Sequence, residues 1–170
     1  LIKNGLCYPP HEVKYEQSIV APAVNYLFQL YELTGKILYL EEGKKQLAVL
    51  VLFNGHQPDF HMYENAVRHW DGYWFGKYKN LGDTFPHYWS SLSGVAFREY
   101  EKITGERSYG VKAENSLRGV LSMINSDGSA SCAYVYPFMV NNVRCQYADP
   151  WANDQDWALY YYLKEGKNYD

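Results

Sequence analysis

The sequence contains little cysteine and none of the short motifs that identify a type of catalytic reaction. Its three cysteines, Cys7, Cys132 and Cys145, form no Cys-x-x-Cys pair, which argues against a structural zinc site. An odd number also argues against a secreted disulfide scaffold, so buried free thiols are the simpler interpretation, although Cys132 and Cys145 flank a predicted hairpin. No His-Glu-x-x-His motif, glycine-rich phosphate loop or Gly-x-Ser-x-Gly elbow is present. We therefore expect no metal and no cofactor, and we exclude an α/β-hydrolase.

The chain also lacks an excess of positive charge and any long apolar run. Its formal net charge is -3, so the chain lacks the excess of positive charge that nucleic-acid-binding domains carry. No apolar run approaches the length of a membrane span, and we expect no membrane partner. The sequence starts Leu-Ile-Lys, without an initiator methionine or a signal peptide, which suggests processing or a fragment of a longer chain. The sequence does not identify the cellular compartment, and a bacterial cytoplasm or periplasm is the simplest expectation.

A length of 170 residues suits a single domain spanning residues 1–170. Hydrophobic residues make up 47 % of the chain, yet the mean hydropathy is -0.44. The two values are compatible because 18 tyrosines are counted as hydrophobic although each carries a hydroxyl group. The charged fraction of 21 % is ordinary for a folded domain.

Five segments carry apolar residues at spacings of three and four, which predicts amphipathic helices. Glycines after Thr34, Asn54 and Thr104 are typical stop signals, and Pro22 means that the first helix either starts there or kinks. The predicted helices are Val13–Leu33, Ile37–Phe53, His87–Ile103, Ser108–Ile124 and Trp151–Leu163, with a shorter one over Tyr63–Trp70. Between residues 132 and 147 the pattern alternates around Asn141-Asn142, which predicts one small β-hairpin.

A weak internal repeat relates the two halves of the chain. The sequence Tyr-Glu-Leu-Thr-Gly-Lys at 31–36 and the sequence Glu-Lys-Ile-Thr-Gly-Glu at 101–106 each join two predicted helices. Helices joined so tightly must run antiparallel and pack together. One hairpin of this kind cannot bury both of its faces, so repeated hairpins form solenoids or closed rings.

The Thr-Gly repeat, the Tyr-Glu-Gln-Ser sequence at 15–18 and the aromatic loops between hairpins resemble the six-hairpin glycosidase-like α/α toroids. The blocks 61–71, 82–89 and 149–156 look like those of bacterial carbohydrate-active proteins of this type. The resemblance implies an all-α fold, about half of an (α/α)6 barrel, with the β-hairpin added. It also implies that the chain is the C-terminal part of a larger enzyme. A half toroid would expose an apolar flank, so we expect a homo-oligomer or pairing with the remainder of a longer chain.

Titratable and aromatic residues are concentrated between His56 and Trp89. Four of the five histidines and three of the five tryptophans lie there, in long loops of the kind that often carry function. Aromatic rings and proton-transfer groups together are typical of clefts that bind carbohydrate. We therefore expect a glycan substrate, bound by His61, His69, Trp74, Asp83, Tyr88, Trp89 and Trp151. Trp157 lies in mid-helix and is expected in the core.

Glycoside hydrolysis of a polysaccharide or oligosaccharide is the first chemistry that these residues suggest. It needs an acid and a second carboxylate, separated by roughly 5 to 10 Å. The expected catalytic residues are Glu64, Asp71, His87 and Asp154, with Asp71 or Asp154 as the acid. The structural alternative is that a carboxylate such as Asp83 or Asp154 caps a helix.

Two other functions remain open at this point. A polysaccharide lyase acting on uronic acids would use a histidine as base, a tyrosine as acid and Arg68 to neutralise the carboxylate. The histidine would be His61, His69 or His87, and the tyrosine Tyr63, Tyr73 or Tyr88. A non-catalytic module for glycan binding or assembly would rely on its tryptophans and would not need the carboxylates.

Overall fold

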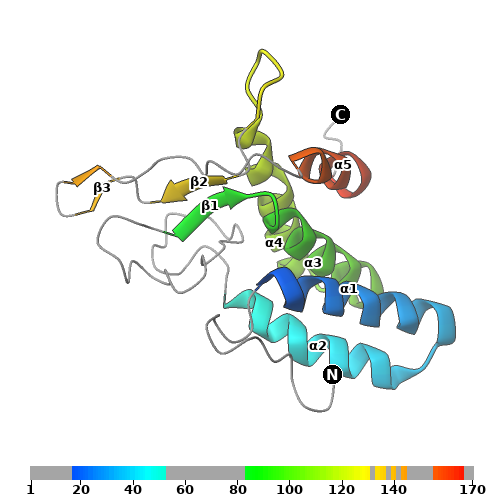
Figure 1. Cartoon of the computed structure of the whole chain (residues 1–170). Coiled ribbons are helices and arrows are strands. Elements are labelled where there is room, and N and C mark those ends of the chain that lie inside the picture. The colour runs from blue at the N-terminus through cyan, green and yellow to red at the C-terminus, as the bar shows by residue number, and fades with distance from the viewer. Residues whose placement is uncertain are drawn as a thin grey trace.

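The computed structural model of this chain describes residues 17–52, 83–130, 133–136, 139–140, 143–144 and 155–166. The three cysteines and the helix predicted over 63–70 lie outside these ranges. Within them the chain forms helical hairpins, shown in Figure 1. The helices are α1 (Gln17–Thr34), α2 (Ile37–Val51), α3 (Ser90–Thr104), α4 (Arg107–Gly119) and α5 (Gln155–Glu165).

These helices confirm the prediction of an all-α hairpin fold, with corrections at some boundaries. The first helix extends through Pro22 and begins before it. The third begins at Ser90 and not at His87, because residues 83–87 form a strand. The fourth tightens into a 3-10 helix, Val120–Met123, in its last turn. Such a tightened turn is common where a helix ends.

The Thr-Gly turns of the two hairpins have the same structure. Gly35 and Gly105 adopt φ angles of 65° and 76°, a conformation that glycine adopts without steric cost. The Gly35 amide donates to the Tyr31 carbonyl at 2.7 Å, and the Gly105 amide donates to the Glu101 carbonyl at the same distance. In both turns the threonine hydroxyl donates to the carbonyl four residues earlier. The sequence repeat is therefore a repeat of structure.

The helices lie in two layers. Helix α3 packs between α1 and α5, while α2 and α4 each pack against the first helix of their own hairpin. The main core lies between these layers and contains Phe28, Leu47, Phe97, Tyr100 and Leu117 among its largest buried side chains. This side-by-side order of hairpins is the arrangement that the resemblance to α/α toroids implies.

Two short antiparallel strand pairs extend from the helices. Strand β1 (Asp83–His87) pairs with β2 (Ala133–Tyr136), with Asp83 opposite Tyr136 and His87 opposite Ala133. Strand β3 (Met139–Val140) pairs with β4 (Val143–Arg144) across residues 141–142, within the segment for which the sequence predicts a hairpin. The sequence pattern does not predict the β1–β2 pairing, because the two strands lie about fifty residues apart in the chain.

Arg98 of α3 is a buried cation that connects three helices. Its Nη1 donates to Glu101 Oε2 at 2.6 Å, and its Nη2 donates to Glu114 Oε2 of α4 at 2.9 Å. Its Nε donates to the Glu165 carbonyl of α5 at 3.2 Å. One turn further along α3, Lys102 Nζ lies 2.7 Å from Glu165 Oε2. Because a buried charge is costly unless it is fully paired, this network sets how α4 and α5 sit on α3.

Tyr100 forms a second polar link, near the Thr-Gly turns. Its hydroxyl donates to Glu106 Oε1 at 2.9 Å and is hydrogen-bonded by the Lys44 ammonium of α2. Burial, followed by the Glu106 carboxylate, raises the pKa of the Tyr100 phenol above its usual value of 10.0, while Lys44 acts in the opposite direction. The same contact raises the pKa of Lys44. The link joins α2, α3 and the residue before α4.

Replacing Arg98 should destabilise the protein strongly. We expect Arg98→Leu to lower the free energy of unfolding by about 3 to 5 kcal/mol, because it removes the charge that compensates the buried Glu114 carboxylate and the half-buried Glu101 carboxylate. Lys45→Met is the control, because the Lys45–Glu42 pair is exposed and screened by water, so its loss should change the free energy of unfolding little. Urea unfolding followed by circular dichroism measures both. A loss under about 1 kcal/mol for Arg98→Leu would show that the network is not the link between the helices.

The Tyr100 phenol should make the fold sensitive to alkaline pH. Its neutral form is favoured in the folded state, so its contribution is complete below pH 10 and falls as the pH rises through the raised pKa. Tyr100→Phe should cost about 1 kcal/mol near neutral pH, through the lost hydrogen bond, and should flatten the decline above pH 10. Tyr26→Phe, at an exposed ring, controls for the loss of a phenol. Urea midpoints from pH 7 to 11 test this, and an unchanged alkaline decline in Tyr100→Phe would contradict it.

Candidate functional site

The two ends of the hairpins differ in character. At one end the Thr-Gly turns join α1 to α2 and α3 to α4. At the opposite end α2 finishes, β1 leads into α3 and α5 begins, as Figure 1 shows. We call this second end the loop end. The sequence-predicted site residues that the structure describes all lie there, on the segment from Asp83 to Trp89.

An aromatic cluster of Tyr88, Trp89 and Trp157 joins the start of α3 to the start of α5. The Tyr88 and Trp89 rings lie 5.5 Å apart, and Trp157 meets them edge-on at 6.2 Å and 5.7 Å respectively. Tyr88 is only 7 % exposed and packs with Val120, Met123 and Ala158. Trp89 is half-buried. Such edge-to-face contacts hold the rings rigidly, so the cluster is a preformed aromatic surface.

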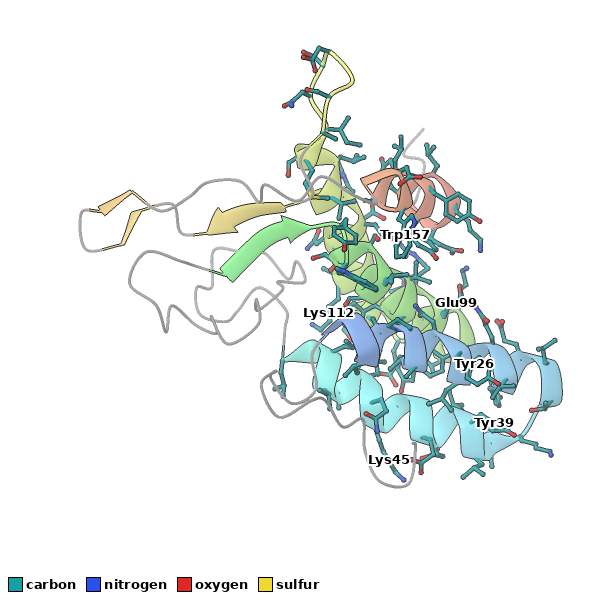
Figure 2. All side chains as sticks on the ribbon, viewed as in Figure 1. Tyr26, Tyr39, Lys45, Glu99, Lys112 and Trp157 are labelled. Atoms are coloured by element: carbon teal, nitrogen blue, oxygen red, sulfur yellow. The ribbon has the colours of Figure 1, made fainter. Side chains whose placement is uncertain are left out.

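Trp157 differs from its prediction. The sequence places it in the core, because its neighbours along the helix are apolar, yet it remains 39 % exposed. Figure 2 labels it on α5, and its ring edges contact α3. Because α5 lies at the margin of the described helices, part of the ring faces outwards. An exposed, rigidly held indole is suited to stacking on a sugar ring, so Trp157 is an addition to the candidate site.

Asp83 and His87 lie at the two ends of strand β1. Asp83 is the first residue of the strand, and its backbone pairs with Tyr136 of β2. His87 is the last residue of the strand and directly precedes Tyr88, so its backbone lies at the loop end, next to the aromatic cluster. The pairing with β2, about fifty residues further along the chain, is what holds this segment in place. The other predicted site residues lie outside the described ranges: His61, Glu64, His69, Asp71, Trp74, Trp151 and Asp154.

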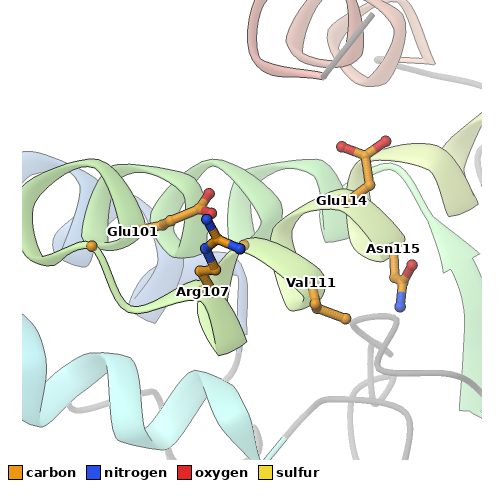
Figure 3. A pocket seen from close by; sticks show the side chains of 7 residues that line it. Glu101, Arg107, Val111, Glu114 and Asn115 are labelled. Carbon is orange, nitrogen blue, oxygen red and sulfur yellow. The ribbon is translucent and has the colours of Figure 1, made fainter. Parts of the chain in front are cut away.

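A surface hollow of about 700 Å³ lies on the other side of the molecule, near the Thr-Gly turn of the second hairpin. Figure 3 shows Glu101 and Arg107 facing the same space, with Glu114 directed towards α5. Both carboxylates are already paired with Arg98. The hollow is lined by Glu101, Gly105, Arg107, Gly110, Val111, Glu114 and Asn115. No sequence signal pointed to it, and its carboxylates serve the helix packing.

Within the part of the chain that the structure describes, no group of three or more histidine, cysteine, aspartate or glutamate side chains is placed to hold a metal ion. Among the same residues no helix is both long and apolar enough to cross a membrane.

Comparison with known proteins shows a similarity to a solved structure. No family model matches the sequence, and no curated protein matches it. A solved structure named Polysaccharide Lyase BACCELL_00875 is similar to it, with 56 % sequence identity and a TM-score of 0.75. The alignment covers 95 % of this chain and 24 % of that protein, so this chain spans about a quarter of the lyase's length. The similarity supports a carbohydrate-active protein with helical hairpins, and it does not single out the six-hairpin glycosidases.

Proposed function

We propose that this chain forms part of a polysaccharide lyase, with the glycan bound at the loop end. The observation that carries the proposal is the 56 % identity to a polysaccharide lyase over 95 % of the chain. Because that lyase is about four times longer, we assign the activity to the complete gene product and not to these 170 residues alone. The exposed Trp157 and the rigid aromatic cluster support a glycan surface at this end.

The reaction would be a β-elimination within a uronic acid. A base removes the proton on C5, next to the carboxylate, and the electrons of that bond form a double bond between C4 and C5. The bond from C4 to the linking oxygen breaks, and an acid donates a proton to that oxygen. A third group must neutralise the carboxylate, because negative charge develops there in the transition state. The chemistry therefore needs a base, an acid and a cation or hydrogen-bond donor.

The sequence offers candidates for all three roles. His61, His69 or His87 would be the base, and Arg68 would neutralise the carboxylate. The acid would be Tyr63, Tyr73 or Tyr88. Among the described candidates we favour His87, because β1 brings it to the loop end. Tyr88 is better suited to positioning its neighbours, since its ring is almost completely buried against Val120 and Met123.

The remaining predicted residues would bind the sugar chain. Trp74, Trp89 and Trp151, joined by Trp157, would stack on sugar rings. His61, His69 and Asp83 would hydrogen-bond to hydroxyl groups. Glycoside hydrolysis would instead depend on Glu64, Asp71 and Asp154, with His87. No observation favours hydrolysis or pure glycan binding over elimination, whereas the similar protein is a lyase.

Elimination can be distinguished from hydrolysis by its product. We expect the complete gene product to release oligosaccharides with an unsaturated, ultraviolet-absorbing uronic acid from at least one member of a panel of uronic-acid polysaccharides. Each cut by elimination produces one double bond, so absorbance should rise in step with new reducing ends. New reducing ends without absorbance would identify a hydrolase. Binding without new ends would identify a non-catalytic module.

Substitutions at 87 and 88 separate the catalytic role from the packing role. His87→Ala should lower kcat by roughly 10²- to 10⁴-fold, the usual range for a lost general base, while the Tm stays near that of the native protein. Tyr88→Phe keeps the ring of the aromatic cluster and should change kcat little. A loss in Tyr88→Phe as large as that in His87→Ala would instead make Tyr88 the acid. Full activity in His87→Ala would move the base to His61 or His69.

A further inference from the structure

One side of helix α5 carries two aromatic rings and a lysine. Trp157, Tyr160 and Lys164 are spaced three and four residues apart, which places their side chains on the same face of the helix. Trp157 and Tyr160 are 39 % and 57 % exposed, and the Lys164 side chain is 57 % exposed. We call these three residues the α5 face. At a rise of about 1.5 Å per residue, the α5 face extends roughly 10 Å along the helix.

The α5 face is continuous with the aromatic cluster at the loop end. Trp157 belongs to both, because its ring meets Tyr88 and Trp89 edge-on near the start of the helix. The other end of α5 reaches Arg98, whose Nε donates to the Glu165 carbonyl. The α5 face therefore leads from the loop end along the side of the molecule, in the direction in which α5 runs beside α3 (Figure 1).

Both rings of the α5 face are held by their neighbours. Tyr160 and Tyr161 meet edge-to-face with their ring centroids 5.2 Å apart, and the Lys164 ammonium lies 6.0 Å from the Tyr160 centroid. Trp157 is fixed in the same way by the aromatic cluster. A ring that is already ordered loses little conformational freedom when a ligand stacks on it, so these rings form a preformed binding surface.

The chemistry of the α5 face fits a sugar chain better than another helix. An indole, a phenol and an ammonium all carry hydrogen-bond donors, which would need partners in a dry helix contact. Leu159 and Leu163, four residues apart, form a separate exposed row whose side chains have no polar groups. A sugar chain offers apolar C–H faces to the rings and hydroxyl groups to their polar edges.

Lys164 adds a preference for an acidic sugar. Its ammonium lies 3.8 Å from Glu165 Oε1, while the other oxygen of that carboxylate is bound more closely by Lys102, at 2.7 Å. An ammonium group has three N–H donors, so Lys164 can also donate to a carboxylate of a ligand. A uronic acid carries such a carboxylate next to an apolar sugar face. The α5 face therefore presents both kinds of contact that suit a uronic-acid chain.

We propose that the α5 face binds an acidic polysaccharide beyond the loop end, as an extension of the substrate cleft. Trp157 and Tyr160 stack on sugar rings, and Lys164 binds a uronic carboxylate. The identity of the glycan rests on the proposed lyase function, whereas the binding surface rests on these three residues. Long chains then bind better than short ones, because a short oligosaccharide bound at the loop end does not reach Tyr160 and Lys164.

Substrate length tests this in the complete gene product. The substrates are a member of a panel of alginate, polygalacturonate, hyaluronan and heparan sulfate that is cut, and the shortest oligosaccharide of that polymer that is still cut. The double variant Tyr160→Ala/Lys164→Gln should raise KM for the polymer by roughly 3- to 30-fold, the effect of losing a ring contact and an exposed ion pair. Its kcat and its KM for the short substrate should stay at the native values. Tyr26→Ala/Lys45→Gln is the matched control, with the same residue types exposed on α1 and α2, and should change neither KM.

Three results would overturn the proposal. An unchanged KM for the polymer in the double variant would mean that the glycan does not reach the α5 face. An equal rise in KM for both substrates would place Tyr160 and Lys164 at the bond that is cut. A Tm well below that of the control variant would mean that another part of the gene product covers this face.

Affinity electrophoresis separates this proposal from the proposed function. If the complete gene product cuts no member of the panel, the lyase assignment fails, and the native protein is run through gels that contain each polymer. Retardation that the double variant loses and the control variant keeps would support the α5 face as a glycan-binding surface without catalysis. A native protein that no polymer retards would overturn the inference as well.

Discussion

The buried guanidinium of Arg98 is the interaction on which the arrangement of the described helices depends. A cation removed from water needs several partners at once, and Arg98 finds them on α3, α4 and α5. Satisfying all of them leaves little freedom in how α5 sits against α3. The network holds the end of α5, at Glu165, against α3, while the contacts of Trp157 with Tyr88 and Trp89 hold its start at the loop end.

The two ends of the hairpins have different tasks. The Thr-Gly turns are short, repeat the same hydrogen bonds and are supported by the Lys44–Tyr100–Glu106 link, so this end maintains the fold. The loop end receives long connections, strand β1 and the aromatic cluster. Scaffolds commonly separate rigid packing from variable loops in this way. The hollow near the second Thr-Gly turn belongs to the end that maintains the fold, since its carboxylates are ion-paired to Arg98.

The similarity to a polysaccharide lyase is compatible with the exposed apolar residues on the outer side of α5. The chain spans about a quarter of the length of the similar lyase, and Leu159, Tyr160 and Leu163 of α5 are exposed within the described residues. The expected half toroid, its apolar flank and the lyase chemistry are therefore aspects of a single proposal: a part of a longer carbohydrate-active protein.

The sequence by itself determined the helices and their turns, because helical periodicity and glycine stop signals act over a few residues. The sequence patterns at residues 33–36 and 103–106 predicted both hairpins. The titratable and aromatic residues around His87 and Trp89 indicated which segment carries the candidate site. Only the tertiary structure decided the rest. Strand β1 depends on a partner about fifty residues away, so the local pattern at His87 indicated the start of a helix instead. The exposure of Trp157 and the pairing of Arg98 depend on which helices lie beside α3 and α5, and no local pattern of side chains encodes that.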